Sequence, residues 1–109
     1  WGRTVSKPHT VDLSAMQENA GEAAQLLKSL ANSSRLMVLC ALVSREHTVG
    51  ELEGLTGLSQ SAISQHLARL REAGLVAARR DAQRMFYALH NAEVRAVLET
   101  LHGIYCPEA

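Results

Sequence analysis

Two cysteines, Cys40 and Cys106, carry the most reactive side chains of this chain and lie 66 positions apart. Neither belongs to a Cys-x-x-Cys motif or to a Cys/His pairing, so their spacing fits neither a zinc knuckle nor a thioredoxin-type site. A thiolate can be oxidised through a sulfenic acid, or converted by a sulfane-sulfur donor to a persulfide and then to a bridge of two or more sulfur atoms. From the residues alone, the two cysteines are either inert core thiols or a redox pair.

A second group of candidate residues lies on a helix predicted over residues 60–73, which has Ile63, Leu67 and Leu70 on its apolar face. Four short polar side chains occupy the other side of this helix: Gln60, Ser61, Ser64 and Gln65. Glutamine can contact adenine through two hydrogen bonds and serine can bond several bases, so this face suits base reading in the major groove. A polar helix face is also often only hydrated. His66 is expected to pack, to be hydrogen-bonded, or to reach a phosphate.

The segment before this helix predicts a partner helix. Thr48 and Glu51 have the spacing of a capping box, which indicates a short helix from Val49 to about Thr56. Gly57 ends that helix, and Ser59 is an N-cap for the next one. Two helices joined by a short turn with glycine form a helix-turn-helix motif.

After Gly74 the pattern changes to two short strands, predicted over residues 75–80 and 85–89, around a polar stretch at 81–84. The pattern predicts a β-hairpin. Three arginines on it are candidates for contacts with DNA phosphates: Arg79, Arg80 and Arg84. A hairpin whose arginines are only solvated is the other interpretation.

The remaining periodic segments predict helices over Leu13–Ala31 and over Ser33 to about Ser44, and a last helix that Asn91 caps and that ends at Cys106-Pro107. The second helix is apolar nearly all round, so it should be central, with Arg35 toward solvent. The fold class expected is therefore mainly α with a small β-hairpin wing. We expect residues 1–12 to form a flexible arm and residues 13–109 to form one winged helix-turn-helix domain for DNA binding and dimerisation.

Composition limits the function classes. The 109 residues are 47% hydrophobic but only 4% aromatic, which suits one packed helical domain built from aliphatic residues. Eleven basic residues balance eleven acidic ones, and such neutrality argues against a nucleic-acid binder. Residues 59–84, however, hold five arginines against two carboxylates, a net charge of +3, which leaves −3 elsewhere. The longest apolar run, Leu36–Val43, is far below the roughly 20 residues of a membrane span, so we expect a cytoplasmic protein without membrane contact.

The combination resembles the ArsR/SmtB family of winged-helix repressors over about residues 14–106. The segments that carry the resemblance are Leu30-Ala-Asn-Ser-Ser-Arg-Leu36, Thr48-Val-Gly-Glu-Leu52, Leu58-Ser-Gln-Ser-Ala-Ile-Ser-Gln-His-Leu67, and Leu70-Arg-Glu-Ala-Gly-Leu-Val76 followed by Phe86-Tyr87. The resemblance implies a homodimer built on the first and last helices. It also implies that Gln60, Ser61, Ser64 and Gln65 meet double-stranded operator DNA with an inverted repeat.

The resemblance also bears on the signal. Metal-responsive members carry Cys-x-Cys at the start of the third helix, where this chain has Thr48-Val49-Gly50, and Glu93 and His102 do not reproduce the ligands of the last helix. We therefore expect no metal and no cofactor. One branch of the family, which responds to sulfide or persulfide, carries cysteines at the positions of Cys40 and Cys106, which implies that a di- or polysulfide bridge between them releases DNA. A peroxide-responsive regulator, an anti-repressor and a metal-responsive repressor remain alternatives. We expect no enzyme, because no histidine is recognisably paired with either cysteine as a general base.

Overall fold

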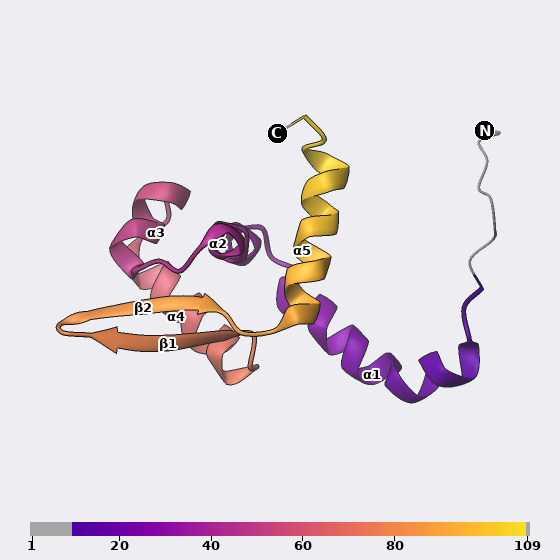
Figure 1. Cartoon of the computed structure of the whole chain (residues 1–109). Coiled ribbons are helices and arrows are strands. Elements are labelled where there is room, and N and C mark those ends of the chain that lie inside the picture. Colours follow the sequence, from indigo (N-terminus) through magenta and orange to yellow (C-terminus); the bar gives the residue numbers. More distant parts are fainter. Residues whose placement is uncertain (1–9, 109) are drawn as a thin grey trace.

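The computed structural model describes residues 10–108, and in these residues five helices and one two-stranded hairpin follow one another (Figure 1). The elements are α1 (Leu13–Leu30), α2 (Ser33–Ser44), α3 (Val49–Thr56), α4 (Gln60–Glu72), β1 (Val76–Asp81), β2 (Arg84–Leu89) and α5 (Ala92–Tyr105). This order is that of a winged helix, with α3 and α4 as the helix-turn-helix and the hairpin as the wing. The predicted fold class is confirmed.

Side-chain caps explain where the helices begin. A capping residue accepts a hydrogen bond from a backbone N–H group of the first turn that has no partner within the helix. The capping residues are Asp12 for α1, Asn32 for α2, Thr48 for α3, Ser59 for α4 and Asn91 for α5. The Thr48–Glu51 pair forms the predicted capping box. Gly57 and Gly74 have φ angles of +76° and +79°, a conformation that glycine adopts without steric strain, and they end α3 and α4 as predicted.

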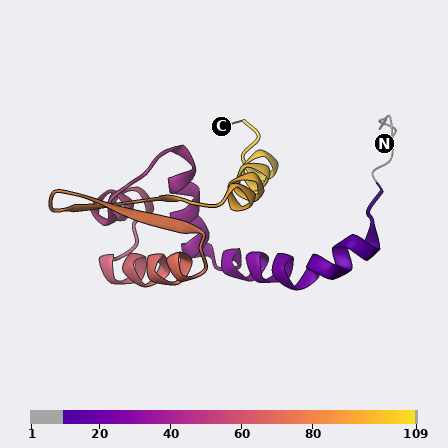
Figure 2. The ribbon, with the colours of Figure 1, turned by 60° about the horizontal axis from the view of Figure 1, so that its bottom comes forward.

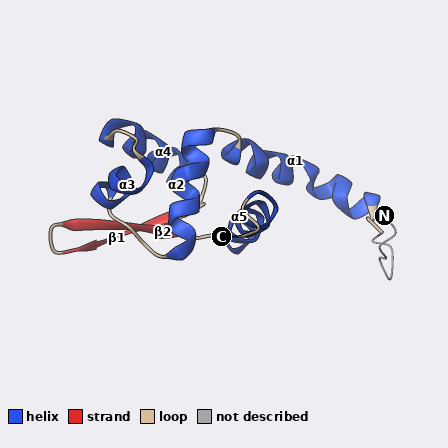
Figure 3. Ribbon diagram, turned by 90° about the horizontal axis from the view of Figure 1, so that it is seen from above, coloured by secondary structure: helices blue, strands red, loops and turns tan. Residues whose placement is uncertain are grey.

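The core lies around α2, which packs against each of the other helices and against the wing (Figure 3). Every residue of the hydrophobic core is aliphatic, and burial of one such side chain stabilises a fold by roughly 1.5–3 kcal/mol. The core residues are Leu30, Val38, Leu39, Leu42, Leu52, Ile63, Leu67, Leu70, Leu75, Val76, Val94 and Leu98. The predicted central place of α2 is confirmed. Arg35 of α2, predicted toward solvent, is instead half-buried, because its Nε and Nη2 atoms donate to carbonyl groups at the end of α1.

Helix α1 projects away from this core (Figures 1 and 2). Its periodic apolar face is mostly exposed, with Leu13, Met16 and Leu27 in solvent and only Leu30 buried. Of the predicted arm, residues 1–9 lie outside the described residues, whereas Asp12 caps α1. Within the described part of the chain, no single helix is long and apolar enough to cross a membrane, and α1 with α2 meet that test together only across a 95° bend.

The wing is longer toward its tip than the sequence predicted. Asp81 and Arg84, which we placed in the connecting stretch, are cross-strand partners, so the turn consists of Ala82 and Gln83 alone. Ala82 has a φ angle of +58°, which corresponds to the first central residue of a tight hairpin turn and normally favours glycine. The two-residue turn lets the ladder continue by one pair, which is why both strands extend beyond their predicted limits.

Candidate nucleic-acid interface and thiol pair

Helix α4 presents the predicted polar face to solvent. Ile63, Leu67 and Leu70 are buried and hold the helix on the core, and Ser59 caps its N-terminus. All four predicted base-reading residues are exposed together on this helix: Gln60, Ser61, Ser64 and Gln65. An anchored helix with short polar side chains near its N-terminus is the arrangement that recognition helices use in the major groove.

Two of the three wing arginines share one side of the hairpin. Phe86 lies opposite Arg79 across the ladder and two positions after Arg84 along β2. The guanidinium carbon atoms of Arg79 and Arg84 lie 4.7 and 5.1 Å from the centre of the Phe86 ring, within the range of cation–π attraction. Arg80 pairs with Met85 and projects from the opposite side of the hairpin, where it is exposed.

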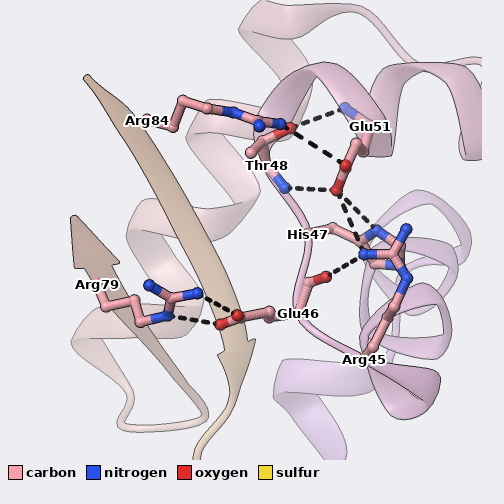
Figure 4. Close-up of polar contacts among 7 residues, drawn as sticks. All are labelled: Arg45, Glu46, His47, Thr48, Glu51, Arg79 and Arg84. Atoms are coloured by element: carbon pink, nitrogen blue, oxygen red, sulfur yellow. Dashed lines mark hydrogen bonds and ion pairs between the residues drawn. The ribbon is translucent and has the colours of Figure 1, made fainter. Parts of the chain in front are cut away.

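Arg79 is bound by a carboxylate from the segment between α2 and α3 (Figure 4). Its Nε atom donates to Glu46 Oε1 at 2.9 Å, and its Nη2 atom donates to Glu46 Oε2. The hydrogen bonds from Arg79 lower the pKa of Glu46, and the same pairing raises the pKa of Arg79. This two-point contact anchors the wing to the helical core. A DNA phosphate at Arg79 would have to compete with Glu46.

A second carboxylate, Glu51 of α3, joins the start of the helix-turn-helix to the wing (Figure 4). It accepts the backbone N–H of Thr48 at 3.1 Å, lies 3.1 Å from His47 Nδ1, and lies 3.7 and 3.8 Å from the guanidinium groups of Arg45 and Arg84. The Thr48 N–H and then the His47 contact lower the pKa of Glu51. Glu51 therefore caps α3 and at the same time faces an arginine of the wing.

His47 ties the same segment to the sheet. It is a buried polar residue, with 5% of its surface exposed, and its backbone N–H and C=O groups pair with the C=O and N–H groups of Tyr87 at 3.0 and 2.8 Å. Sequence reasoning missed His47 and Glu46, since neither belongs to a local motif. The capping-box pattern pointed to Glu51 but not to its contact with the wing.

The two cysteines carry free thiols in the described structure. Cys40 is half-buried in α2 and packs against the core, whereas Cys106 is exposed at the C-terminal end of α5, where its N–H donates to His102 O at 2.7 Å. Burial raises the pKa of the Cys40 thiol, and negative charge on the Cys106 thiolate raises it further. The fold thus places two residues that are 66 positions apart on two helices that pack against each other, α2 and α5.

The candidate metal ligands of the last helix do not gather with other ligand side chains in the described residues. Between residues 10 and 108 there is no group of three or more His, Cys, Asp or Glu side chains that could hold a metal ion. Glu93 and His102, the candidates on the last helix, both lie on the surface of α5.

Comparison with known proteins identifies the family. Residues 32–78 match the family model described as "Bacterial regulatory protein, arsR family". The chain is 50% identical over 96 residues to the transcriptional activator HlyU of Vibrio cholerae serotype O1, an alignment that covers 88% of this chain and 89% of the relative. The chain belongs to the ArsR family. Its described architecture, with a helix-turn-helix and a wing, is that of a DNA-binding transcriptional regulator of this family.

Solved structures of other ArsR-family proteins share the fold. The crystal structure of the transcriptional repressor BigR from Xylella fastidiosa superposes with a TM-score of 0.84 at 41% identity and covers 88% of this chain and 98% of that one. The structure of reduced HlyU from Vibrio cholerae gives a TM-score of 0.80 at 50% identity and covers 85% of this chain and 98% of the other. The winged-helix fold is therefore shown both by the elements of this structure and by its superposition on solved structures.

Proposed function

We propose that this ArsR-family regulator is a homodimeric repressor controlled by two thiols. In the reduced form, α4 and the wing bind double-stranded operator DNA with an inverted repeat. A sulfane-sulfur donor then joins Cys40 to Cys106 through a di- or polysulfide bridge, and the bridged dimer releases the DNA. Two similar proteins support this proposal. BigR is described as a transcriptional repressor, and one solved structure of HlyU is described as the reduced form.

The observation that carries this proposal is that the two thiols lie on helices that pack against each other, Cys40 in α2 and Cys106 at the end of α5. Cys40 lies in α2, which packs against both α3 and α4, whereas Cys106 ends α5. A bridge would therefore tie the support of the recognition helix to the last helix. Arg95 of α5 also donates a hydrogen bond to Val43 O of α2 at 2.6 Å, so the two helices are in direct contact. A bridge that shifts one of these helices would therefore also move the other.

The chemistry starts at the accessible thiol. A thiolate of exposed Cys106 attacks the outer sulfur of a persulfide R–S–SH, takes that sulfur, and releases R–SH. The Cys40 thiolate then attacks the Cys106 sulfur and expels the added sulfur as H₂S, which leaves a disulfide. Each further sulfur atom in a longer bridge uses one more R–S–SH and releases one more R–SH. No metal or enzyme is needed for these steps.

The bridge needs to change the free energy of DNA binding only modestly. A difference of about 1–3 kcal/mol between the bridged and reduced forms would change DNA affinity about 5- to 150-fold, which suffices for release. Such a difference needs only a small change in the relative placement of two recognition helices, because an inverted repeat fixes their spacing at about one helical turn of DNA.

Exposed apolar side chains support the dimer. Leu13 and Leu27 of α1, and Ile104 and Tyr105 of α5, are each at least 60% exposed in the single chain. Burial of apolar surface is the main driving force for association, and a dimer built on α1 and α5 would cover these residues. Tyr105→Lys should shift the protein toward the monomer in sedimentation experiments and weaken operator binding.

The decisive experiment measures operator affinity before and after treatment with a polysulfide donor, for the wild type, Cys40→Ser and Cys106→Ser. We expect the donor to weaken binding only in the wild type, and mass spectrometry should show an intramolecular bridge. Release of DNA by both serine variants would refute the thiol mechanism. Parallel arms with peroxide and with zinc test the alternatives: a response to peroxide alone, or to zinc in a double-serine protein, would reassign the signal.

An anti-repressor on the same fold is the second candidate, because the relative HlyU is named an activator. Transcription in vitro from an operator-bearing promoter separates the two. The proposed repressor lowers transcription with purified polymerase alone. An anti-repressor changes transcription only when a competing DNA-binding protein is also present.

A further inference from the structure

A small basic concavity lies where α1, α2 and α4 meet, away from the wing. It is an open depression with a volume of about 190 Å³. Its lining residues are Gln25, Lys28, Ser29, Arg35, Arg69 and Leu70. Three of the six are cations, each from a different helix, and none is a carboxylate. Among the ion pairs within residues 10–108, none involves Lys28, Arg35 or Arg69.

Arg35 is held in place at this concavity. Its Nε and Nη2 atoms donate to the carbonyl oxygens of Ser29 and Lys28 in the last turn of α1. A guanidinium group has five N–H donors, so these two bonds leave three for a ligand. An arginine oriented by backbone contacts is suited to bind an anion because little side-chain entropy remains to be lost.

The concavity brings together the positive charges of Lys28, Arg35 and Arg69. Burial lowers the pKa of His66, and the charges of Arg35 and Arg69 lower it further. Like charges that converge without a counter-ion repel each other, and this cost is offset when an anion binds between them. The concavity is therefore suited to an anionic group and unsuited to a cation or an apolar ligand.

The place of the concavity points to the anion. Arg69 lies four residues after Gln65 on α4, so the two side chains are neighbours along the helix surface. α4 and α1 lie along the same edge of the molecule (Figure 2), and the concavity lies at their junction. A duplex whose major groove receives the start of α4 would bring a strand of its backbone along this edge.

We infer that Lys28, Arg35 and Arg69 bind a backbone phosphate of the DNA that α4 reads, as a contact separate from the wing. This inference rests on the DNA binding in the proposed function. The contact would be independent of sequence and would position α4 rather than specify bases. It would hold the part of α4 that lies next to α1 and α2, while the wing contacts the duplex at another place.

The test compares Arg69→Gln, Arg69→Lys and Lys28→Gln with the wild-type dimer, on operator DNA and on random DNA, over a series of salt concentrations. Loss of one phosphate contact should reduce the slope of log K against log salt by about 0.9. The same relation gives roughly an eightfold loss of affinity at 0.1 M salt and a threefold loss at 0.3 M. These values are the upper limit for Arg69→Gln, because Lys28 and Arg35 remain at the site. We expect a reduced slope and weaker binding by Arg69→Gln on both DNAs, and retention of the slope for Arg69→Lys, which keeps the charge.

An unchanged slope in Arg69→Gln and Lys28→Gln, beside normal salt-dependent binding by the wild type, would overturn the inference and leave the proposed function intact. Absence of salt-dependent binding by the wild type would instead refute the proposed function. Lys28→Gln decides the matter if Arg69→Gln unfolds, because it alters an exposed residue on another helix. If inorganic phosphate raises the melting temperature of the wild type but not of Arg69→Gln, while DNA slopes stay equal, the site takes a free anion and the inference is wrong.

Discussion

A bridge between Cys40 and Cys106 should stabilise the fold while it weakens DNA binding, and these opposite signs make a sharp prediction. The bridge would close a loop of 66 positions. Loop-closure entropy for this length stabilises the folded state by about 4 kcal/mol, and measured bridges commonly reach about 2–4 kcal/mol. Unfolding entropy of about 2.1 cal/mol/K per residue gives roughly 0.23 kcal/mol/K for a chain of this size, so the melting temperature should rise by about 9–17 °C.

The assay pairs thermal unfolding with fluorescence anisotropy on labelled operator, using the same donor-treated sample. Cys106→Ser provides the matched control, because it retains the half-buried Cys40 but cannot form the intramolecular bridge. A chemically damaged protein would lose both stability and DNA affinity. A fall in melting temperature on treatment, or an equal rise in Cys106→Ser, would therefore refute an intramolecular bridge as the cause of release.

Three further sets of predictions concern the turn of the wing, the carboxylate Glu46 that binds the wing, and the residues of α4 and the wing that contact DNA. Ala82→Gly removes the steric cost of a positive φ angle, so it should raise the unfolding free energy by about 0.5–1 kcal/mol and the melting temperature by about 2–4 °C. Glu46→Gln should flatten the dependence of stability on pH in acid: the lowered pKa means that ionised Glu46 stabilises the fold above its unfolded pKa, about 4.3, and that this stabilisation is lost as the pH falls through the folded pKa. Urea unfolding between about pH 5 and pH 3 measures this slope. Gln65→Ala should reduce base discrimination about 5- to 150-fold at one operator position, whereas Arg80→Gln should weaken binding to all sequences, and more so than Arg84→Gln, because Arg84 faces Glu51. Anisotropy titrations on operator and random DNA distinguish these outcomes.

Each of these has a result that contradicts it. Gln83→Gly is the control for the turn, and equal effects of the two glycine substitutions would exclude strain at Ala82 as the cause. Glu53→Gln makes the same charge change on α3, and an equally flattened acid limb in that variant would remove the special role of Glu46. Equal loss of affinity on operator and random DNA for Gln65→Ala would contradict base reading by that side chain.

The helix boundaries could be predicted because their causes are local. Asn32, Ser59 and Asn91 each cap a helix through a contact with a residue three positions along, so the capping residue and its partner lie in one short segment. Gly57 and Gly74 likewise act on their own turns. A sequence pattern contains all the information that such a contact needs.

The polar contacts of the site could not be predicted in this way. Glu46 and Arg79 are 33 positions apart, and no local motif links them. Their meeting depends on the hairpin packing back across the segment between α2 and α3, which is a property of the assembled core. The exposure of Leu13 and Leu27 could not be predicted either, because helical periodicity identifies an apolar face but does not say which surface covers it.

The structure also changes the meaning of the charge balance. The segment 59–84 carries +3, but two of its five arginines, Arg79 and Arg84, face carboxylates that lie outside that segment, Glu46 and Glu51. Those carboxylates lie beside the wing, so the positive potential available to DNA there is smaller than the arginine count suggests. Arg69 lies toward the C-terminal end of α4, and no carboxylate lines the concavity that it shares with α1 and α2. Non-specific attraction should therefore be stronger at the junction with α1 than at the wing, and Arg69→Gln should reduce affinity for random DNA more than Arg79→Gln does.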